Sequence, residues 1–338
     1  MHVTAPLHIA IDAMSGDRGT SVSVPAALAA AREFPDVRFT LIGRQADLQR
    51  EIAGTTLPNV ACLHAADVVE MSDHPREALR RKKDSSMRRA IDLVKAQDAH
   101  ACVSAGNTGA LMATAHFVLK MLPGVERPAI VSTIPSRTGH TYMLDLGANA
   151  SCTPSQLCQF AIMGSVLASD LQRAHGRPRV GLLNIGEEEI KGNETVRAAN
   201  ELLAAADLNY IGFVEGHDIF SGRVDVVVTD GFTGNVALKA IEGAARLITD
   251  TLREELTRTN TRKLGALIAK PAFDALRTRL DPRSYNGATM VGLNGIVIKS
   301  HGGADAFGFQ RAIEVAVLEA RNGVPAHIVE RLAVSREA

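Results

Sequence analysis

The chain of 338 residues is long enough for one large α/β domain or two smaller ones, and its 46% hydrophobic residues can bury a sizeable core. The 37 basic and 37 acidic residues balance, which argues against bulk binding of nucleic acid and leaves only local patches for charged partners. The four cysteines form no Cys-x-x-Cys pair, so we expect reduced thiols in a cytoplasmic protein. We recognise no secretory signal and no apolar run of the ~20 residues that a membrane span needs.

Apolar runs, polar loops and helical patterns alternate along the chain. The predicted strands, each with its following loop, lie in residues 8–17, 37–43, 101–106, 141–150, 179–194, 209–216, 223–235 and 291–305. The predicted helices cover about residues 22–33, 108–121, 154–171, 193–206, 236–256 and 305–321. This alternation predicts an α/β fold with a mostly parallel sheet flanked by helices. We expect one α/β domain over residues 1–338, with a helical insertion at 257–285.

Five glycine-bearing loops follow apolar strands, at residues 12–17, 104–109, 145–149, 230–235 and 300–305. Open α/β sheets bind ligands in the crevice outside the carboxyl ends of their strands. Glycines let backbone N–H groups approach an anion, and helix N-termini attract phosphate. Tight turn closure could explain any one loop, but their recurrence favours a shared phosphate or substrate site. The candidate binding residues are Asp12, Gly16, Ser104, Gly106, Asn107, Thr108, Gly109, Asn149, Asp230, Gly231, Gly234, Gly302 and Gly303.

Familiar catalytic motifs are missing from the sequence. No loop matches the Walker pattern or the dinucleotide-binding glycine pattern, and there is no Gly-x-Ser-x-Gly elbow, reactive-cysteine motif or His-Glu-x-x-His metal motif. We therefore expect no cofactor and no metal. The expected chemistry is direct attack by a bound substrate, with the protein supplying positioning and electrostatic stabilisation.

Three side chains are candidates for catalysis. Lys191, among acidic neighbours, is either a solvated loop residue or an ammonium placed over phosphate. Asn235 is either a helix N-cap or an amide donor to a developing oxyanion. His301 stands beside two glycines at a strand end, where it either lines the site or lies on the surface.

Six segments resemble the bacterial phosphate acyltransferases of phospholipid synthesis, over about residues 8 to 322. They are DAMSGD, VSAGNTGALMA, DLGAN, NIGEEEIKGNE, GFVEGHDIFSGRVDVVVTDGFTGNVALK and YNGATMVGLNGIVIKSHGGAD. The resemblance implies a fold similar to that of phosphate acetyltransferase and the isocitrate and isopropylmalate dehydrogenases. One departure is Ser15, where the family usually has a second glycine, and it leaves the role of the first loop open.

The resemblance also implies an activity. A long-chain fatty acyl group would move from acyl carrier protein to inorganic phosphate, giving acyl phosphate for phosphatidic acid and phospholipid synthesis. The lysine of KGNE and the asparagine of GFTGN, here Lys191 and Asn235, are the implied catalytic residues. The implied partners are a second copy of the chain, the cytoplasmic membrane by peripheral contact, and a glycerol-phosphate acyltransferase. Two alternatives stay open: a phosphate acetyltransferase that uses coenzyme A, and a membrane scaffold for lipid-synthesis enzymes.

Two segments carry a local excess of basic residues although the chain as a whole has no net charge. The region 74–89 is either a solvated helix face or a dock for the acidic carrier protein, and its candidate docking residues are Arg80, Arg81, Lys82 and Lys83. The region 258–283 has seven basic and two acidic residues interleaved with apolar ones. It is either a hairpin buried in a dimer interface or a surface for an anionic bilayer, with Leu264, Leu267 and Ile268 as the candidate membrane contacts.

Overall fold

The computed structural model describes residues 6–172 and 176–337, and within them one mixed sheet of 11 strands runs through the molecule. The strand order is β3-β2-β1-β4-β11-β10-β5-β6-β9-β7-β8. The strands are β1 (His8–Asp12), β2 (Arg38–Gly43), β3 (Val60–His64), β4 (Ala101–Ser104), β5 (Ala129–Ser136), β6 (Gly139–Leu144), β7 (Arg179–Leu183), β8 (Asn209–Val214), β9 (Val226–Val228), β10 (Ala288–Val291) and β11 (Ile296–Lys299).

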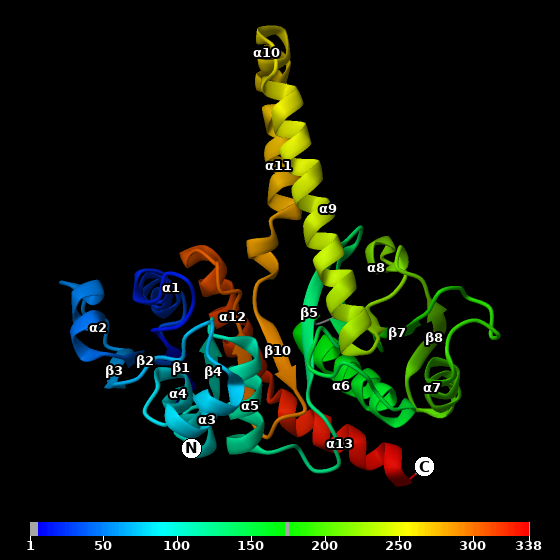
Figure 1. Ribbon diagram of the computed structural model, residues 1–338, viewed down its shortest axis with the longest axis horizontal. Helices are drawn as coiled ribbons and strands as arrows, with labels where there is room; N and C mark the ends of the chain where they lie inside the picture. The colour runs from blue at the N-terminus through cyan, green and yellow to red at the C-terminus, as the bar shows by residue number, and fades with distance from the viewer. Residues whose placement is uncertain (1–5, 173–175, 338) are drawn as a thin grey trace.

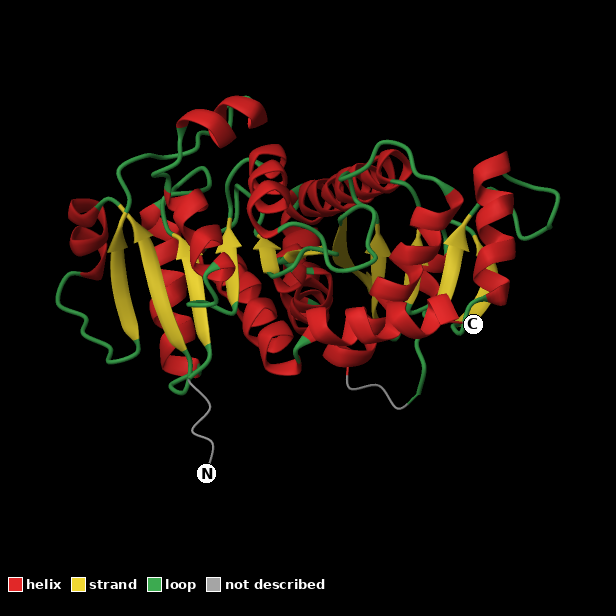
Figure 2. Cartoon of the chain, turned by 90° about the horizontal axis from the view of Figure 1, so that it is seen from below, coloured by secondary structure: helices red, strands yellow, loops and turns green. Residues whose placement is uncertain are grey.

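The sheet is parallel except at its centre, as expected for a mostly parallel α/β fold. Strands β1, β2, β3, β4 and β11 pair in parallel on one side, and β6, β9, β7 and β8 do so on the other. The antiparallel pairings β10–β11, β10–β5 and β5–β6 join these two halves. Figure 2 shows the halves side by side along the sheet.

Helices cover both faces of each half (Figure 1). The helices are α1 (Thr20–Glu33), α2 (Gln45–Ile52), α3 (Pro75–Arg81), α4 (Ser86–Lys95), α5 (Thr108–Leu119), α6 (Pro154–Gln172), α7 (Glu194–Ala205), α8 (Asp218–Ser221), α9 (Gly231–Thr257), α10 (Asn260–Ile268), α11 (Lys270–Leu280), α12 (Ala306–Asn322) and α13 (Val324–Glu337), with a 3-10 turn η1 (Pro282–Tyr285).

Strand β1 illustrates how the sequence builds these layers. It is buried throughout, and successive side chains of a strand point to opposite faces. Ile9 and Ile11 join α1 and α12 in one core, whereas Ala10 joins α4 and α5 in another. Both faces of the strand are therefore apolar, which explains its unbroken hydrophobic run. The half built on β6, β7 and β9 has a core of its own beneath α6, α7 and α13.

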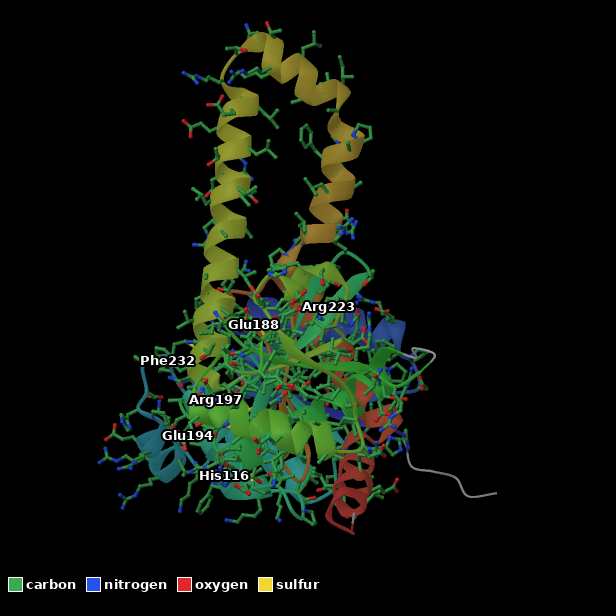
Figure 3. All side chains as sticks on the ribbon, turned by 90° about the vertical axis from the view of Figure 1, so that its right-hand side faces the viewer. His116, Glu188, Glu194, Arg197, Arg223 and Phe232 are labelled. Atoms are coloured by element: carbon green, nitrogen blue, oxygen red, sulfur yellow. The ribbon has the colours of Figure 1, made fainter. Side chains whose placement is uncertain are left out.

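A helical hairpin made of α9, α10 and α11 projects from the α/β body (Figures 1 and 3). Helix α9 has 27 residues, so its regular rise carries it far beyond the sheet. At the base, the Arg279 guanidinium donates to the Ser136 carbonyl at 3.3 Å and to the Arg137 carbonyl. Apolar side chains along the hairpin stay exposed, among them Leu247, Leu267 and Ile268. None of the helices within residues 6–172 and 176–337 is long and apolar enough to cross a bilayer.

Candidate functional site

Three of the five predicted loops meet at the carboxyl ends of β1, β4 and β11. We call loops 12–17, 104–109 and 300–305 the serine–glycine cluster. The backbone N–H of Asp17 donates to the Gly302 carbonyl at 2.9 Å, and that of Ser300 donates to the Ser104 carbonyl at 2.9 Å. The three strands are neighbours in the sheet, so their ends lie at one edge. Long-range folding thus brings together residues almost 300 positions apart.

Ser15, the departure from the family pattern, ties two of these loops together. Its hydroxyl donates to the Asp12 carbonyl and accepts from the N–H of Ala105, both at 2.9 Å. The neighbouring Gly16 has φ of +86°, and a Cβ there would lie 3.0 Å from the Gly302 carbonyl oxygen. The first loop is therefore a rigid turn that only glycine fits at position 16.

Asp12 is buried at the base of the serine–glycine cluster. Its Oδ2 accepts from the Ser104 hydroxyl at 2.6 Å, and the same hydroxyl accepts from the N–H of Gly106 at 3.1 Å. Burial raises the pKa of the Asp12 carboxyl, and the Ser104 hydrogen bond opposes that rise. Asp12 and Ser104 thus hold the loops in place from below.

Lys299, the last residue of β11, is a site residue that sequence reasoning missed. Only 9% of its surface is exposed. Its Nζ donates to the carbonyls of Ala105, at 3.5 Å, and Ser300. Burial lowers the pKa of the ammonium to about 8, an effect that Asp17 and Asp12 oppose and that Lys239 of α9 reinforces. The signal in the sequence was a lysine ending an otherwise apolar strand, Ile-Val-Ile-Lys.

The other two predicted loops meet in the second half of the sheet, where Asp145 organises them. Its Oδ1 accepts from the N–H groups of Ile130, Gly147 and Ala148 at 3.0–3.2 Å. Its Oδ2 accepts from the N–H and the side-chain amide of Asn149 at 2.8 and 2.9 Å. The Asn149 amide also donates to the Pro128 carbonyl. Both donors of that amide are thus used within the fold, which gives the predicted binding residue Asn149 a structural role.

Helix α9 begins at Gly231, five residues earlier than predicted, because Asp230 caps it. The Asp230 Oδ1 accepts from the N–H of Thr233 at 2.8 Å. The N-cap interpretation of Asn235 is therefore wrong, since Asn235 lies in the second turn and is exposed. Gly231 donates to the Asn149 carbonyl, and a Cβ on Gly234 would stand 1.9 Å from the Asp145 carbonyl oxygen. These close contacts fix the start of α9 against the Asp145 loop.

Asn235 and Lys239 lie on one face of α9. Asn235 lies against Gly147, where a Cβ would be 3.6 Å from the Asn235 Cβ. Lys239 follows four residues later, on the same face of α9, and its charge reaches Lys299 in the serine–glycine cluster. Lys239 is therefore near enough to Lys299 for its charge to help lower the pKa of that ammonium.

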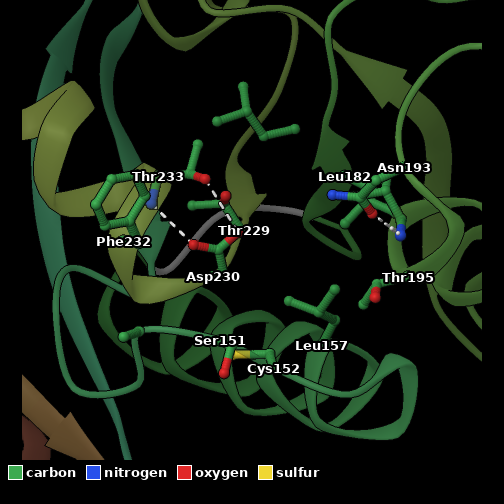
Figure 4. Close-up of a pocket in the computed structure, with 13 residues that line it drawn as sticks. Ser151, Cys152, Leu157, Leu182, Asn193, Thr195, Thr229, Asp230, Phe232 and Thr233 are labelled. Carbon is green, nitrogen blue, oxygen red and sulfur yellow. Dashed lines mark hydrogen bonds between the residues drawn. The ribbon is translucent and has the colours of Figure 1, made fainter.

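A cavity of about 310 Å³ opens at the carboxyl ends of β7 and β9. Figure 4 shows Asp230, the N-cap of α9, with Phe232 and Thr233 of that helix on one side of it and Leu182, Asn193 and Thr195 on the other. Cys152 also lines it, and burial, with the charges of Asp145 and Asp230, raises the pKa of its thiol to about 12. The thiol therefore stays protonated near neutral pH and is a poor nucleophile.

The remaining predicted residues have mixed surroundings. Lys191 is exposed, two residues before the cavity-lining Asn193, and does not itself line the cavity. Asn107 caps α5 through Ala110 and donates to the Met71 carbonyl at 2.7 Å. Its amide therefore serves the fold. The exposed His301 ring accepts from the N–H of Gly303 at 3.1 Å.

The predicted docking residues lie at the end of α3. Arg80, Arg81 and Lys83 are exposed. Lys82 instead turns inward, where its Nζ donates to the Val68 carbonyl at 2.7 Å and pairs with Asp73. The free basic surface here is therefore smaller than the sequence suggested.

Known proteins resemble this chain over nearly its whole length. A family model described as "Fatty acid synthesis protein" matches residues 7–327. The "Phosphate acyltransferase" of Methylococcus capsulatus is 56% identical over 328 residues, 96% of each chain. That of Alkalilimnicola ehrlichii is 56% identical over 335 residues, 98% of this chain and 97% of its own.

Solved structures share the fold at low sequence identity. A phosphotransacetylase from Streptococcus pyogenes aligns with a TM-score of 0.60 at 15% identity, and the alignment covers 93% of this chain and 94% of that one. The EutD phosphotransacetylase from Staphylococcus aureus aligns with a TM-score of 0.58 at 14% identity and the same coverage. The expected phosphate acetyltransferase-like fold is confirmed. With the match to the family model and the 56% identity to the two relatives, the chain belongs to the fatty acid synthesis protein family that includes the bacterial phosphate acyltransferases.

Proposed function

We propose that this protein transfers a long-chain fatty acyl group from acyl carrier protein to inorganic phosphate, producing acyl phosphate for phosphatidic acid and phospholipid synthesis. The observation that carries the proposal is the hydrogen-bonded convergence of the serine–glycine cluster at parallel strand ends. Strand ends of this kind bind ligands, and their backbone N–H groups suit an anion. The names of the relatives support acyl transfer to phosphate.

The chemistry needs no covalent enzyme intermediate. A phosphate oxygen attacks the thioester carbonyl carbon, a C–O bond forms, and the C–S bond breaks as its electron pair leaves with sulfur. The thiolate is a good leaving group because its conjugate acid has a pKa of about 8.5. Asn235 and nearby N–H groups stabilise the oxyanion, and the Lys191 ammonium neutralises phosphate charge. The raised pKa of Cys152 agrees with a reaction that uses no protein thiolate.

The decisive experiment is incubation with palmitoyl-acyl carrier protein and isotopically labelled phosphate, with mass detection of palmitoyl phosphate. A second reaction contains both palmitoyl-acyl carrier protein and acetyl-coenzyme A, so that the two acyl donors compete for the labelled phosphate. Preferential formation of acetyl phosphate would make the protein a phosphate acetyltransferase. If neither acyl phosphate forms, the catalytic proposal fails and a scaffolding role replaces it.

The catalytic assignments are tested by single replacements. Asn235→Ala should lower kcat by about a hundredfold, since removing one oxyanion donor costs roughly 10²–10³ in rate. Lys191→Ala should also lower the rate sharply at saturating acyl carrier. Wild-type turnover in the Lys191 variant would remove that residue from the mechanism.

The carrier-protein dock is proposed at the exposed end of α3. Opposite charges speed encounter, so added salt should raise the KM for the carrier. The double variant Arg80→Glu, Arg81→Glu should raise that KM further while kcat holds. Arg50→Glu, on the exposed helix α2, is the matched control. Equal KM values for both variants would assign the dock to another surface.

The hairpin is the proposed site of both dimerisation and peripheral membrane contact at the cytoplasmic membrane, where a glycerol-phosphate acyltransferase would receive the product. Leu247 and Ile248 are exposed midway along α9, and Leu264, Leu267 and Ile268 are exposed near the tip. We expect a second copy of the chain to pack against the exposed side chains of α9, and an anionic bilayer to bind the basic and apolar residues near the tip. Leu247→Glu should shift sedimentation toward monomer, and Leu267→Glu should weaken co-sedimentation with anionic liposomes. The reverse pattern would exchange the two assignments.

A further inference from the structure

Lys299 carries a buried ammonium group at the end of β11. Its exposed fraction is 9%, and its two hydrogen-bond acceptors are both backbone carbonyls. It has no ion pair with any residue in the described ranges, where the ion-paired lysines are Lys82, Lys239 and Lys270. Lysine is almost never fully buried unless it is paired, because removing a charge from water is costly. The fold therefore keeps a buried ammonium that two backbone carbonyls bind and that no carboxylate in the described ranges pairs with, a setting that would favour an anion from outside.

The surroundings of Lys299 select the kind of anion. The serine–glycine cluster places Ser300 and Ala105 in contact with the ammonium, and Gly106 and Gly302 stand in the adjoining turns. Lys239, on the face of α9 that also carries Asn235, is near enough for its charge to act on Lys299, although Lys239 is itself paired with Glu242 at 2.9 Å. A compact anion with several oxygens can accept from an ammonium and from backbone N–H groups together.

The nearest carboxylates do not fill this role themselves. Asp12 is held by the Ser104 hydroxyl beneath the loops. Asp17 lies on the outer turn, where a Cβ on Gly302 or Gly303 would be 3.4 Å from its carboxylate oxygens. Both act on Lys299 through longer-range attraction and neither pairs with it. The two carboxylates therefore favour the protonated form of Lys299 without pairing with its ammonium.

We propose that Lys299 is the inner phosphate-binding residue of the proposed acyl transfer reaction, holding inorganic phosphate at the serine–glycine cluster beside the ends of β4 and β11. The assignment rests on the proposed function and adds a direct substrate contact to it. Phosphate bound here would have one oxygen held by Lys299 and the others free to accept from backbone N–H groups or to react.

The test measures the steady-state dependence on phosphate at saturating palmitoyl-acyl carrier protein. Lys299→Met should raise the KM for phosphate by about tenfold to a hundredfold, the loss expected for a hydrogen bond to a charged group. Lys299→Arg should recover part of the affinity because it keeps the charge. Lys95→Met, on an exposed position of α4, should match the wild type. A folded Lys299→Met variant with an unchanged KM for phosphate would overturn the proposal.

A binding experiment separates this inference from the catalytic one. The melting temperature is measured with inorganic phosphate alone, and with sodium chloride at equal ionic strength. Phosphate should raise the melting temperature of the wild type and of Lys95→Met, but not of Lys299→Met or Lys299→Gln. This holds even if no acyl phosphate forms, in which case the proposed function fails and the phosphate site stands. Equal phosphate-dependent shifts in the wild type and both Lys299 variants would refute the site.

Discussion

Replacing Lys299 by Met should make the phosphate-free protein more stable. Methionine has a similar length and no charge, so it removes the desolvation penalty with little change in packing. A residue retained for binding at the expense of stability is a common feature of functional sites. The prediction therefore distinguishes a functional lysine from one that supports the fold.

The magnitude follows from the pKa of Lys299, which burial lowers from 10.5 to about 8. That difference corresponds to about 3 kcal/mol against the charged form, since one pH unit is worth ~1.4 kcal/mol. Asp12 and Asp17 lose a nearby cation in the variant, so the net gain at pH 7 should be about 1–3 kcal/mol in the free energy of unfolding. Replacements at exposed positions such as Lys95→Met should stay within roughly 0.5 kcal/mol.

The stability difference between the wild type and Lys299→Met should depend on pH. Below about pH 8 the lysine is charged in both states, and the full penalty acts on the native state. Between about pH 8 and 10.5 the native state has released a proton that the unfolded state still binds, so wild-type stability gains on the variant. The advantage of Lys299→Met should thus shrink by about 1 kcal/mol from pH 7 to pH 9.

Urea unfolding followed by circular dichroism at both pH values measures these differences, without and with phosphate. Phosphate at ten times its Kd should stabilise the wild type by about 1.4 kcal/mol and leave the variant unchanged. A Lys299→Met variant that is folded but less stable than the wild type at pH 7 would contradict the prediction that Lys299 destabilises the phosphate-free protein. It would mean that the two carbonyl contacts outweigh the desolvation of the ammonium.

Three further predictions concern the fold around the site. Burial raises the pKa of Glu319 to about 8, and the Thr289 hydrogen bond opposes this rise. Because the native state then binds a proton that the unfolded state has released, the free energy of unfolding of the wild type should fall as pH rises from 4.5 to 8. Glu319→Gln should abolish that fall in urea titrations at pH 5 and 8. Asp145→Ala should cost about 3–5 kcal/mol by chemical denaturation, since it orphans the N–H groups that the carboxylate binds; a loss below 1 kcal/mol would contradict this role. Gly234→Ala should lower the free energy of unfolding by ~3 kcal/mol or more in the same assay, because its Cβ would meet the Asp145 carbonyl oxygen at 1.9 Å. Gly243→Ala, in the same helix but with open space around its Cβ, should instead raise the free energy of unfolding by about 0.5–1 kcal/mol.

Local patterns allowed much of the fold to be predicted. The runs at β1, β2, β4 and β7, and helices such as α5, α6 and α12, follow from hydrophobic periodicity and polar caps. The start of α9 was predicted five residues late, because two glycines in Asp-Gly-Phe-Thr-Gly-Asn favour a loop in isolation. Capping by Asp230 and contact with the Asp145 loop override that preference. Strands β5 and β10, which join the halves in antiparallel pairing, were not predicted.

The alternation of strands and helices, the five polar loops at strand ends and, by resemblance, the family are all evident in the amino-acid sequence. Tertiary structure alone decided which loops meet: 12–17, 104–109 and 300–305 form one group, and 145–149 joins 230–235 in another. It also decided that Lys299 is buried and Lys191 exposed. The two kinds of information differ in the distance along the chain over which the interactions act. Periodicity and capping act within a few residues, whereas the desolvation of a charge depends on every segment packed around it.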